Sequence, residues 1–149
     1  INSDFKICTK NIETNEVSDI LINREKLRNI LQGEYSIYCA PYESSRYPGI
    51  NAKYISSIDC IHDCHDNNDK KATCSYNMKK KKTEDGCVTV SILAFQQGKI
   101  ILTGAQSLKQ LNDTYKFISG VYIDHYIEIK IDKVIDNVKE KKKKVRNNK

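Results

Sequence analysis

The chain has 149 residues, of which 39% are hydrophobic and 30% are charged, with two prolines, six glycines and no tryptophan. This supply of apolar residues is enough for one modest core and excludes a collagen-like or low-complexity chain. The apolar runs are all shorter than the ~20 residues that a membrane span needs. The first residues also lack the basic and apolar regions of a secretion signal. We therefore expect a soluble, intracellular protein that is not secreted and has no membrane partner.

The net charge of +6 is concentrated at one end of the chain. Residues 139–149 carry seven lysines and arginines against Glu140 alone, whereas residues 1–138 carry 18 basic and 18 acidic residues. Such a run is typical of a solvated, disordered end, and less often of a segment that touches nucleic acid. The charge pattern therefore predicts a neutral domain over residues 1–138 and a basic tail over residues 139–149.

The first forty residues predict a strand followed by a helix and a second strand. Residues 5–9 have strand character. Apolar side chains recur at helical spacing up to Leu31, and Ser18 and Asp19 can cap the first turn. Gly33 can supply a left-handed stop. The alternation over residues 35–39 then indicates the second strand.

Residues 50–55 are typical of another strand, which follows the turn formed by Tyr47, Pro48 and Gly49. The character changes over residues 56–86, which are polar, rich in aspartate and lysine, and poor in core candidates. Loops of this length are uncommon in compact domains unless they have a function or a staple of their own. We interpret residues 56–86 as an insertion.

The insertion contains cysteines and histidines that could hold a metal. A structural zinc site needs four thiolate or imidazole ligands, and Cys60, Cys64 and Cys74 supply three of them. The fourth ligand is His65, or alternatively His62 or Cys87, although Cys87 also begins the next strand. Free thiols and a disulfide remain alternatives to zinc.

Residues 87–95 and 99–104 alternate as two strands, joined by a turn at Gln96-Gln97-Gly98, and together predict a hairpin. One face of the first strand is uniformly apolar and belongs on a core. The other face mixes Thr89 and Ser91 with Leu93 and Phe95, which is unusual for a solvent face. The residues of the apolar face are Val88, Val90, Ile92 and Ala94.

Ser107 is positioned to cap a helix over residues 107–119. The helix would carry an apolar stripe formed by Leu108, Leu111, Tyr115 and Ile118. Residues 121–131 alternate apolar and polar side chains, and the pattern leaves open a strand or a helix end followed by a strand. The predicted fold class is α+β, with an antiparallel sheet and helices packed on one face.

Enzyme function is not expected from this sequence. It contains no glycine-rich phosphate loop, no arrangement of Ser, His and Asp, and no paired carboxylates at a plausible strand end. His125 stands alone on an alternating segment and is interpreted as structural. A cysteine nucleophile paired with His62 or His65 stays open as an alternative.

The segment from Phe95 to Ala105 (FQQGKIILTGA) closely resembles the hairpin signature of the TATA-binding protein family. The segment from Tyr42 to Ile50 (YESSRYPGI) is similar to a second motif of that family, and residues 107–119 lie where the family has its long helix. The resemblance implies one repeat, most like the second, of a two-repeat saddle, so that a missing N-terminal repeat or a second copy would complete it. A repeat of this kind is a curved antiparallel sheet with two helices on one face. The composition is similar to that of versions in large DNA viruses.

The resemblance also implies a site. In the family, one sheet surface lies on the DNA minor groove and pairs of phenylalanines wedge between base steps. Phe95 and Tyr47 match the two wedge positions, while Lys53 and Lys99 lie near positions that contact phosphates. The full predicted DNA-binding set is Tyr47, Lys53, Thr89, Ser91, Leu93, Phe95, Lys99, Ile101 and Thr103.

The function that the resemblance implies is a transcription initiation factor that binds and bends A·T-rich promoter DNA. Its partners would be double-stranded DNA, other initiation factors and RNA polymerase, in the nucleus or at a viral transcription site in the cytoplasm. The alternative is a non-catalytic protein-interaction module that keeps the fold without kinking DNA. Apart from a possible structural zinc, no cofactor is expected.

Overall fold

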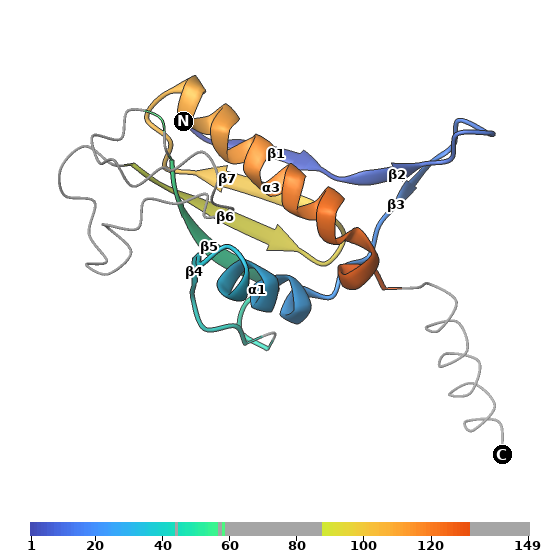
Figure 1. The fold of residues 1–149 in the computed structure, drawn as a ribbon, viewed down its shortest axis with the longest axis horizontal. Helices are drawn as coiled ribbons and strands as arrows, with labels where there is room; N and C mark the ends of the chain where they lie inside the picture. The colour runs from blue at the N-terminus through green and yellow to red at the C-terminus, as the bar shows by residue number, and fades with distance from the viewer. Residues whose placement is uncertain (44, 57, 59–87, 132–149) are drawn as a thin grey trace, which may run out of the picture.

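The structure is a computed structural model that describes residues 1–43, 45–56, 58 and 88–131 (Figure 1). Within these ranges the chain forms seven strands and two helices. In chain order they are β1 (Ser3–Lys6), β2 (Cys8–Lys10), β3 (Val17–Asp19), α1 (Arg24–Gly33), β4 (Tyr38–Cys39), β5 (Gly49–Ile55), β6 (Thr89–Phe95), β7 (Lys99–Thr103) and α3 (Leu108–Ile129).

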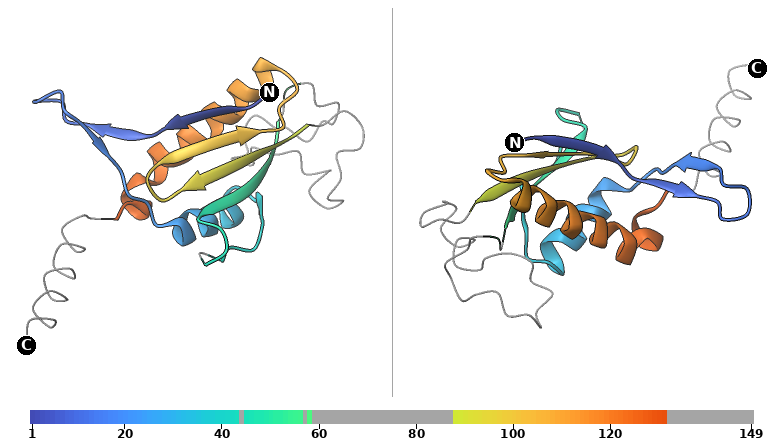
Figure 2. Two further views of the ribbon diagram at one scale, coloured as in Figure 1. Left: turned by 180° about the vertical axis from the view of Figure 1, so that it is seen from behind. Right: turned by 90° about the horizontal axis from the view of Figure 1, so that it is seen from above.

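Five of the strands form one antiparallel sheet in the order β1-β7-β6-β5-β4. The predicted hairpin of β6 and β7 lies at its centre, and Gly98 takes the positive φ of 82° that the turn requires. β2 and β3 form a separate two-stranded ribbon that extends beyond the sheet (Figures 1 and 2). The antiparallel sheet and its two helices confirm the α+β class and are consistent with half of a saddle.

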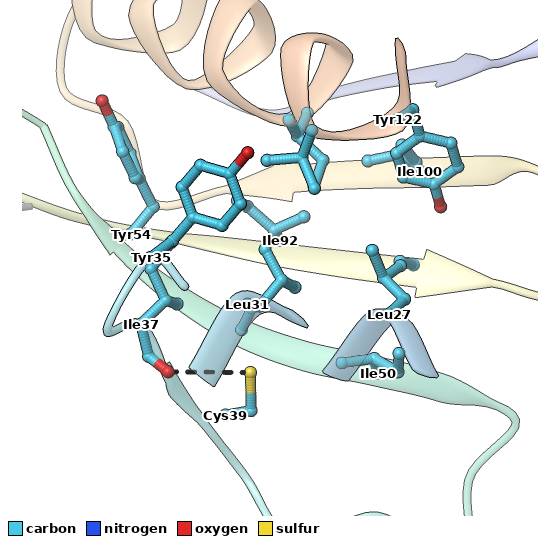
Figure 3. Close-up of a cluster of buried hydrophobic side chains, with 14 of the residues drawn as sticks. Leu27, Leu31, Tyr35, Ile37, Cys39, Ile50, Tyr54, Ile92, Ile100 and Tyr122 are labelled. Carbon is cyan, nitrogen blue, oxygen red and sulfur yellow. Dashed lines mark hydrogen bonds between the residues drawn. The ribbon is translucent and has the colours of Figure 1, made fainter. Parts of the chain in front are cut away.

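Both helices pack on the same face of the sheet, and the core lies between them and the strands (Figure 1). Alternate residues of β6 are fully covered, including Val90 and Ile92, which confirms the core face predicted from the sequence. Leu27 and Leu31 of α1 contribute to the same layer, as Figure 3 shows. Each buried aliphatic side chain of this size contributes about 1.5–3 kcal/mol, so these two helices are held mainly by their apolar faces.

The start of α1 differs from the prediction. Asn23 is the N-cap, and its side chain accepts a hydrogen bond from the backbone N–H of Lys26 at 3.0 Å. Ser18 and Asp19 lie in β3, where they pair with Thr9 and Cys8. Serine, aspartate and asparagine can all cap a helix, but Ser18 and Asp19 are already held in the pairing of β2 with β3.

The expectations for the end of α1 and for the strand after it also need correction. Gly33 is the last helical residue and has no left-handed conformation, while the residue with positive φ is Ser36, at 53°. The predicted strand over residues 35–39 is reduced to β4, because Tyr35 and Ile37 turn inward to the core. The strand predicted over residues 50–55 is confirmed as β5.

Ser107 caps α3 as predicted, accepting a hydrogen bond from the N–H of Gln110 at 3.2 Å. The helix, however, continues to Ile129, so the alternating segment is helical and not a strand. Its end is held by the N–H of Asn23, which donates to the carbonyl of Ile129 at 2.6 Å. The described helices include none that is both long and apolar enough to cross a membrane.

The buried face of α3 is not the predicted stripe. Leu108 and Tyr115 are 71% and 45% exposed, and only Ile118 of the four predicted residues is fully buried. The buried residues lie on a neighbouring face of the helix, which overlaps the predicted stripe at Ile118, and they include polar side chains. They are Gln110, Thr114, Ile118, Val121, Tyr122, His125 and Ile129.

Buried polar contacts tie α3 to the rest of the fold. Asp113 accepts hydrogen bonds from the hydroxyls of Tyr54 at 3.1 Å and Ser56 at 2.7 Å. The two ring nitrogens of His125 lie 3.1 Å from the hydroxyl of Tyr35 and 3.0 Å from a carboxylate oxygen of Glu128. His125 therefore links α3 to the turn that follows α1, in agreement with the structural role expected from the sequence.

Candidate nucleic-acid interface

The face of the five-stranded sheet opposite the helices, here called the open face, carries the second set of alternating side chains. Along β6 these are Thr89, Ser91, Leu93 and Phe95, all half-buried, while the residues between them are buried. No described helix crosses this face (Figure 2). The eight strand residues of the predicted DNA-binding set all lie on the open face.

The strand register arranges these side chains in rows across the open face. Leu93 lies opposite Ile101 of β7 on one side and Asn51 of β5 on the other. A second row contains Lys53, Ser91 and Thr103. The face therefore has an apolar centre and a more polar row beside it.

Phe95 and Tyr47 form an aromatic pair at one end of the open face. Their ring centroids are 6.0 Å apart and the planes are tilted by 57°. Tyr47 is 45% exposed, so one ring of the pair is largely open to solvent. The two residues predicted as wedges, which are 48 positions apart in the sequence, are thus side by side in the fold.

Gly49 makes this pairing of rings possible. It lies opposite Phe95 in the β5–β6 register. A Cβ atom at Gly49 would approach Tyr47 Cε1 at 3.0 Å and Phe95 Cε1 at 3.1 Å. Any larger residue would have to displace both rings, so the missing side chain is part of the site.

Arg24, the first residue of α1, supports the turn that carries Tyr47. Its guanidinium donates a hydrogen bond to the carbonyl of Pro48 and lies over the ring of Tyr42, 5.4 Å from the centroid. The backbone N–H of Tyr47 also bonds to the carbonyl of Glu43 at 3.1 Å. These contacts orient the turn against α1.

A shallow groove of about 400 Å³ begins at Phe95 and follows the tip of the β6–β7 hairpin. Two cationic side chains, Arg24 and Lys99, lie at its edges. Its remaining lining residues are Pro48, Gln96, Gln97 and Ile101. An aromatic ring beside cations and amides suits a phosphate and an adjacent base more than an apolar ligand.

The lysines of the open face already have polar partners. Lys53 Nζ donates to Ser91 Oγ at 2.6 Å, and Lys99 Nζ lies 3.7 Å from Asp4. Lys6, which pairs with Lys99 in the register, has a raised pKa because it bonds to Asp19 at 2.9 Å. All three amines therefore lie on the open face, each beside a polar partner.

The sequence analysis missed residues that share this face. Asn51 lies in the central row, and Asp4 and Lys6 of β1 extend the face at its edge. Asn51 could have been found from the alternation of β5, because it lies two residues before Lys53. Asp4 could not have been found in this way, because its place on the face depends on the pairing of β1 with β7, a strand almost a hundred residues later in the chain.

The predicted zinc ligands Cys60, Cys64, His65 and Cys74 lie outside the described residues, as do the alternatives His62 and Cys87 and the basic tail. In the described part of the chain, no three His, Cys, Asp or Glu side chains are grouped to hold a metal ion. Two cysteines are described there: Cys8 is exposed and Cys39 is buried. Burial raises the pKa of the Cys39 thiol to about 11, so this thiol is not a reactive nucleophile at neutral pH.

An antiparallel sheet with two helices on one face and an aromatic pair on the other is consistent with one repeat, or half a saddle, of the TATA-binding protein class. The chain is 31% identical over 139 residues to a TATA-box-binding protein-like protein of Acanthamoeba polyphaga mimivirus. The match confirms the resemblance: the chain is similar to a TATA-box-binding protein-like protein from a large DNA virus.

The match covers 88% of this chain but only 28% of the viral protein. The chain thus spans less than a third of the length of its relative. No protein-family model matches the sequence, and no solved structure matches it.

Proposed function

We propose that the chain is a non-catalytic transcription initiation factor that binds promoter DNA through the minor groove and bends it. The relationship to a TATA-box-binding protein-like protein supports a transcription-related, DNA-binding role. The observation that carries the finer proposal is the aromatic pair. Tyr47 and Phe95 meet at one end of a face that no described helix covers.

The chemistry of the open face suits a minor groove. The floor of an A·T-rich groove presents acceptors and little else, so a flat surface of aliphatic side chains with few charges can lie against it. Leu93 and Ile101 supply this surface, with Thr103 at its border. Lys53 and Lys99 then exchange their present partners, Ser91 and Asp4, for phosphate oxygens.

Phe95 would enter a base step from the end of the face, with Tyr47 behind it. Unstacking a step costs a few kcal/mol. An aromatic side chain buries about 150–250 Å²; since Phe95 is already half-buried, only the remainder is newly buried in the kinked complex, and at ~25 cal/mol per Å² it offsets part of this cost. Half a saddle supplies one such kink, so a second repeat or a second copy would supply the other.

A bending assay on an A·T-rich duplex labelled at both ends with fluorescent dyes tests the proposal. The wild-type protein should bring the ends closer together, and Phe95→Ala should not. Ile123→Ala is a matched control, because it removes an apolar side chain that is 78% exposed on α3, on the opposite side of the sheet. A wild-type protein that leaves the end-to-end distance unchanged would exclude DNA bending.

The alternative function, a protein-interaction module, is favoured by one observation on α3. Ile123 and Ile127 lie one turn apart and are 78% and 75% exposed, away from the core. Exposed apolar pairs at this spacing are typical of helix docking. Binding of partner proteins by a chain that leaves DNA straight would support this alternative.

A further inference from the structure

Asn51 is the one open-face residue of the central row whose side chain is an amide. Its neighbours in the row are aliphatic: Leu93 lies directly opposite in β6, and Ile101 lies beyond it in β7. On the same strand and the same face, it is flanked by Gly49 and Lys53. A polar group therefore lies within the apolar centre of the face.

No described group fixes the orientation of this amide. The Oδ1 atom of Asn51 is buried and has no hydrogen-bond partner among the described residues. The nearest cationic neighbour on the strand, Lys53, bonds instead to Ser91. A buried acceptor without a donor is unfavourable, and rotation about the terminal torsion of asparagine exchanges its oxygen and nitrogen easily. A ligand on the open face would thus decide which atom points outward.

From this geometry we infer that Asn51 is a specificity-determining residue that lets the open face accept a G·C pair. The inference rests on the proposed minor-groove binding. In the minor groove, every base pair presents acceptors, but only G·C adds a donor, the guanine 2-amino group. With its nitrogen outward Asn51 donates to the common acceptors, and with its oxygen outward it accepts from guanine.

An aliphatic side chain at the same place would exclude guanine. The 2-amino group would be buried against carbon without an acceptor, which is unfavourable. Leu93 and Ile101 of the central row have this character, while Asp4 lies beyond Ile101 at the edge of the sheet. We therefore expect tolerance of G·C at the base pair beneath Asn51 and discrimination against it at the pairs beneath the aliphatic side chains.

The test compares affinities for duplexes that differ only in the 2-amino group. Single A·T pairs of an A·T-rich duplex are replaced in turn by G·C, by inosine·C, which lacks the amino group, and by 2,6-diaminopurine·T, which adds it. At one position of the duplex, the wild-type protein should bind the pairs with and without the amino group with affinities that differ by less than twofold. Positions beneath the aliphatic side chains should bind the amino-bearing pairs about fivefold more weakly.

The variant Asn51→Leu keeps the branched shape at Cγ, is larger, and has no acceptor. At the tolerant position it should weaken binding to G·C about fivefold relative to inosine·C. Asn112→Leu makes the same substitution at an exposed position of α3, away from the open face, and is the matched control, which should leave this ratio unchanged. Thermal melting of each variant shows whether the fold is intact. If a variant does not fold, the comparison of base analogues with the wild-type protein still tests the inference.

The outcomes separate this inference from the proposed function. Bending of the A·T-rich duplex, with the 2-amino group penalised equally at every position, would overturn the role of Asn51 and leave minor-groove binding in place. An unchanged ratio in Asn51→Leu, or the same loss in Asn112→Leu, would also overturn it. Absence of any duplex binding by the wild-type protein would overturn both proposals.

Discussion

Truncation of Phe95 should separate the stability of the fold from its affinity for DNA. Phe95 is half-buried and points away from the core, and its ring contacts Tyr47 and covers Gly49. Removing a fully buried phenylalanine costs about 3–5 kcal/mol. Since only part of this ring is covered in the free protein, Phe95→Ala should lower the free energy of unfolding by about 1 kcal/mol, or a few degrees in Tm.

The loss of DNA affinity should be larger than the loss of stability. Stacking of a base on an aromatic side chain contributes about 1–3 kcal/mol, so Phe95→Ala should weaken binding to an A·T-rich duplex by roughly 5- to 150-fold. Urea unfolding and fluorescence anisotropy measure the two quantities. Ile92→Ala is the control, because Ile92 is fully buried on the other face of the same strand and should lose about 2–5 kcal/mol of stability. If Phe95→Ala destabilises the fold as much as Ile92→Ala does, the ring belongs to the core and the open-face assignment is wrong.

Four further predictions concern the site, the core and the segments outside the described residues. Gly49→Ala should reduce DNA bending more than stability, measured by the same assays, because the added Cβ would displace both rings at 3.0–3.1 Å. Burial, with Asp113 adding to it, raises the pKa of Tyr54 above its ordinary value. The unfolded phenol therefore loses its proton first, so stability should decline by up to about 1.4 kcal/mol per pH unit above pH ~10, and the decline should be shallower in Tyr54→Phe. If Cys60, Cys64, Cys74 and His65 bind zinc, the purified protein should contain about one equivalent of the metal. Removal of the zinc by a chelator should then raise protease cleavage within residues 56–86 only. Metal-free protein with freely titrating thiols would contradict this prediction. Deleting residues 139–149 should reduce the salt dependence of DNA binding without changing the order of preferred duplexes, and an unchanged salt slope would show that the tail does not touch DNA.

The centre of the sheet could be predicted because its signals are local. The alternation of residues 87–104, with a glycine turn in the middle, specifies the hairpin and its two faces within 18 residues. The same alternation identified the core residues Val90 and Ile92. The grouping of Tyr47 with Phe95 came from the family resemblance, because no local pattern joins two residues on different strands.

The helices were harder to place because tertiary contacts override local preference. Ser18, Asp19 and Asn23 are all good caps, and only the pairing of β2 with β3 leaves the last of them for α1. In α3, Ile123 and Ile127 are exposed. With the buried Ile129 they imitate the period of a strand, so the helix was predicted to end at residue 119, ten residues before its end at Ile129.

The pairing of β1 with β7 has a consequence for how the protein is made. Ser3 of β1 lies opposite Leu102 of β7, 99 positions later in the chain, so β1 lies beside a strand that leaves the ribosome long after it. At about 5–20 residues per second, the first strand waits several seconds for its partner. The core also needs Ile118, Val121 and Ile129 of α3, so the nascent chain exposes its apolar layer until nearly the last helical turn is synthesised. Premature termination or slow translation in the second half would therefore leave an aggregation-prone sheet in place of a partly working protein.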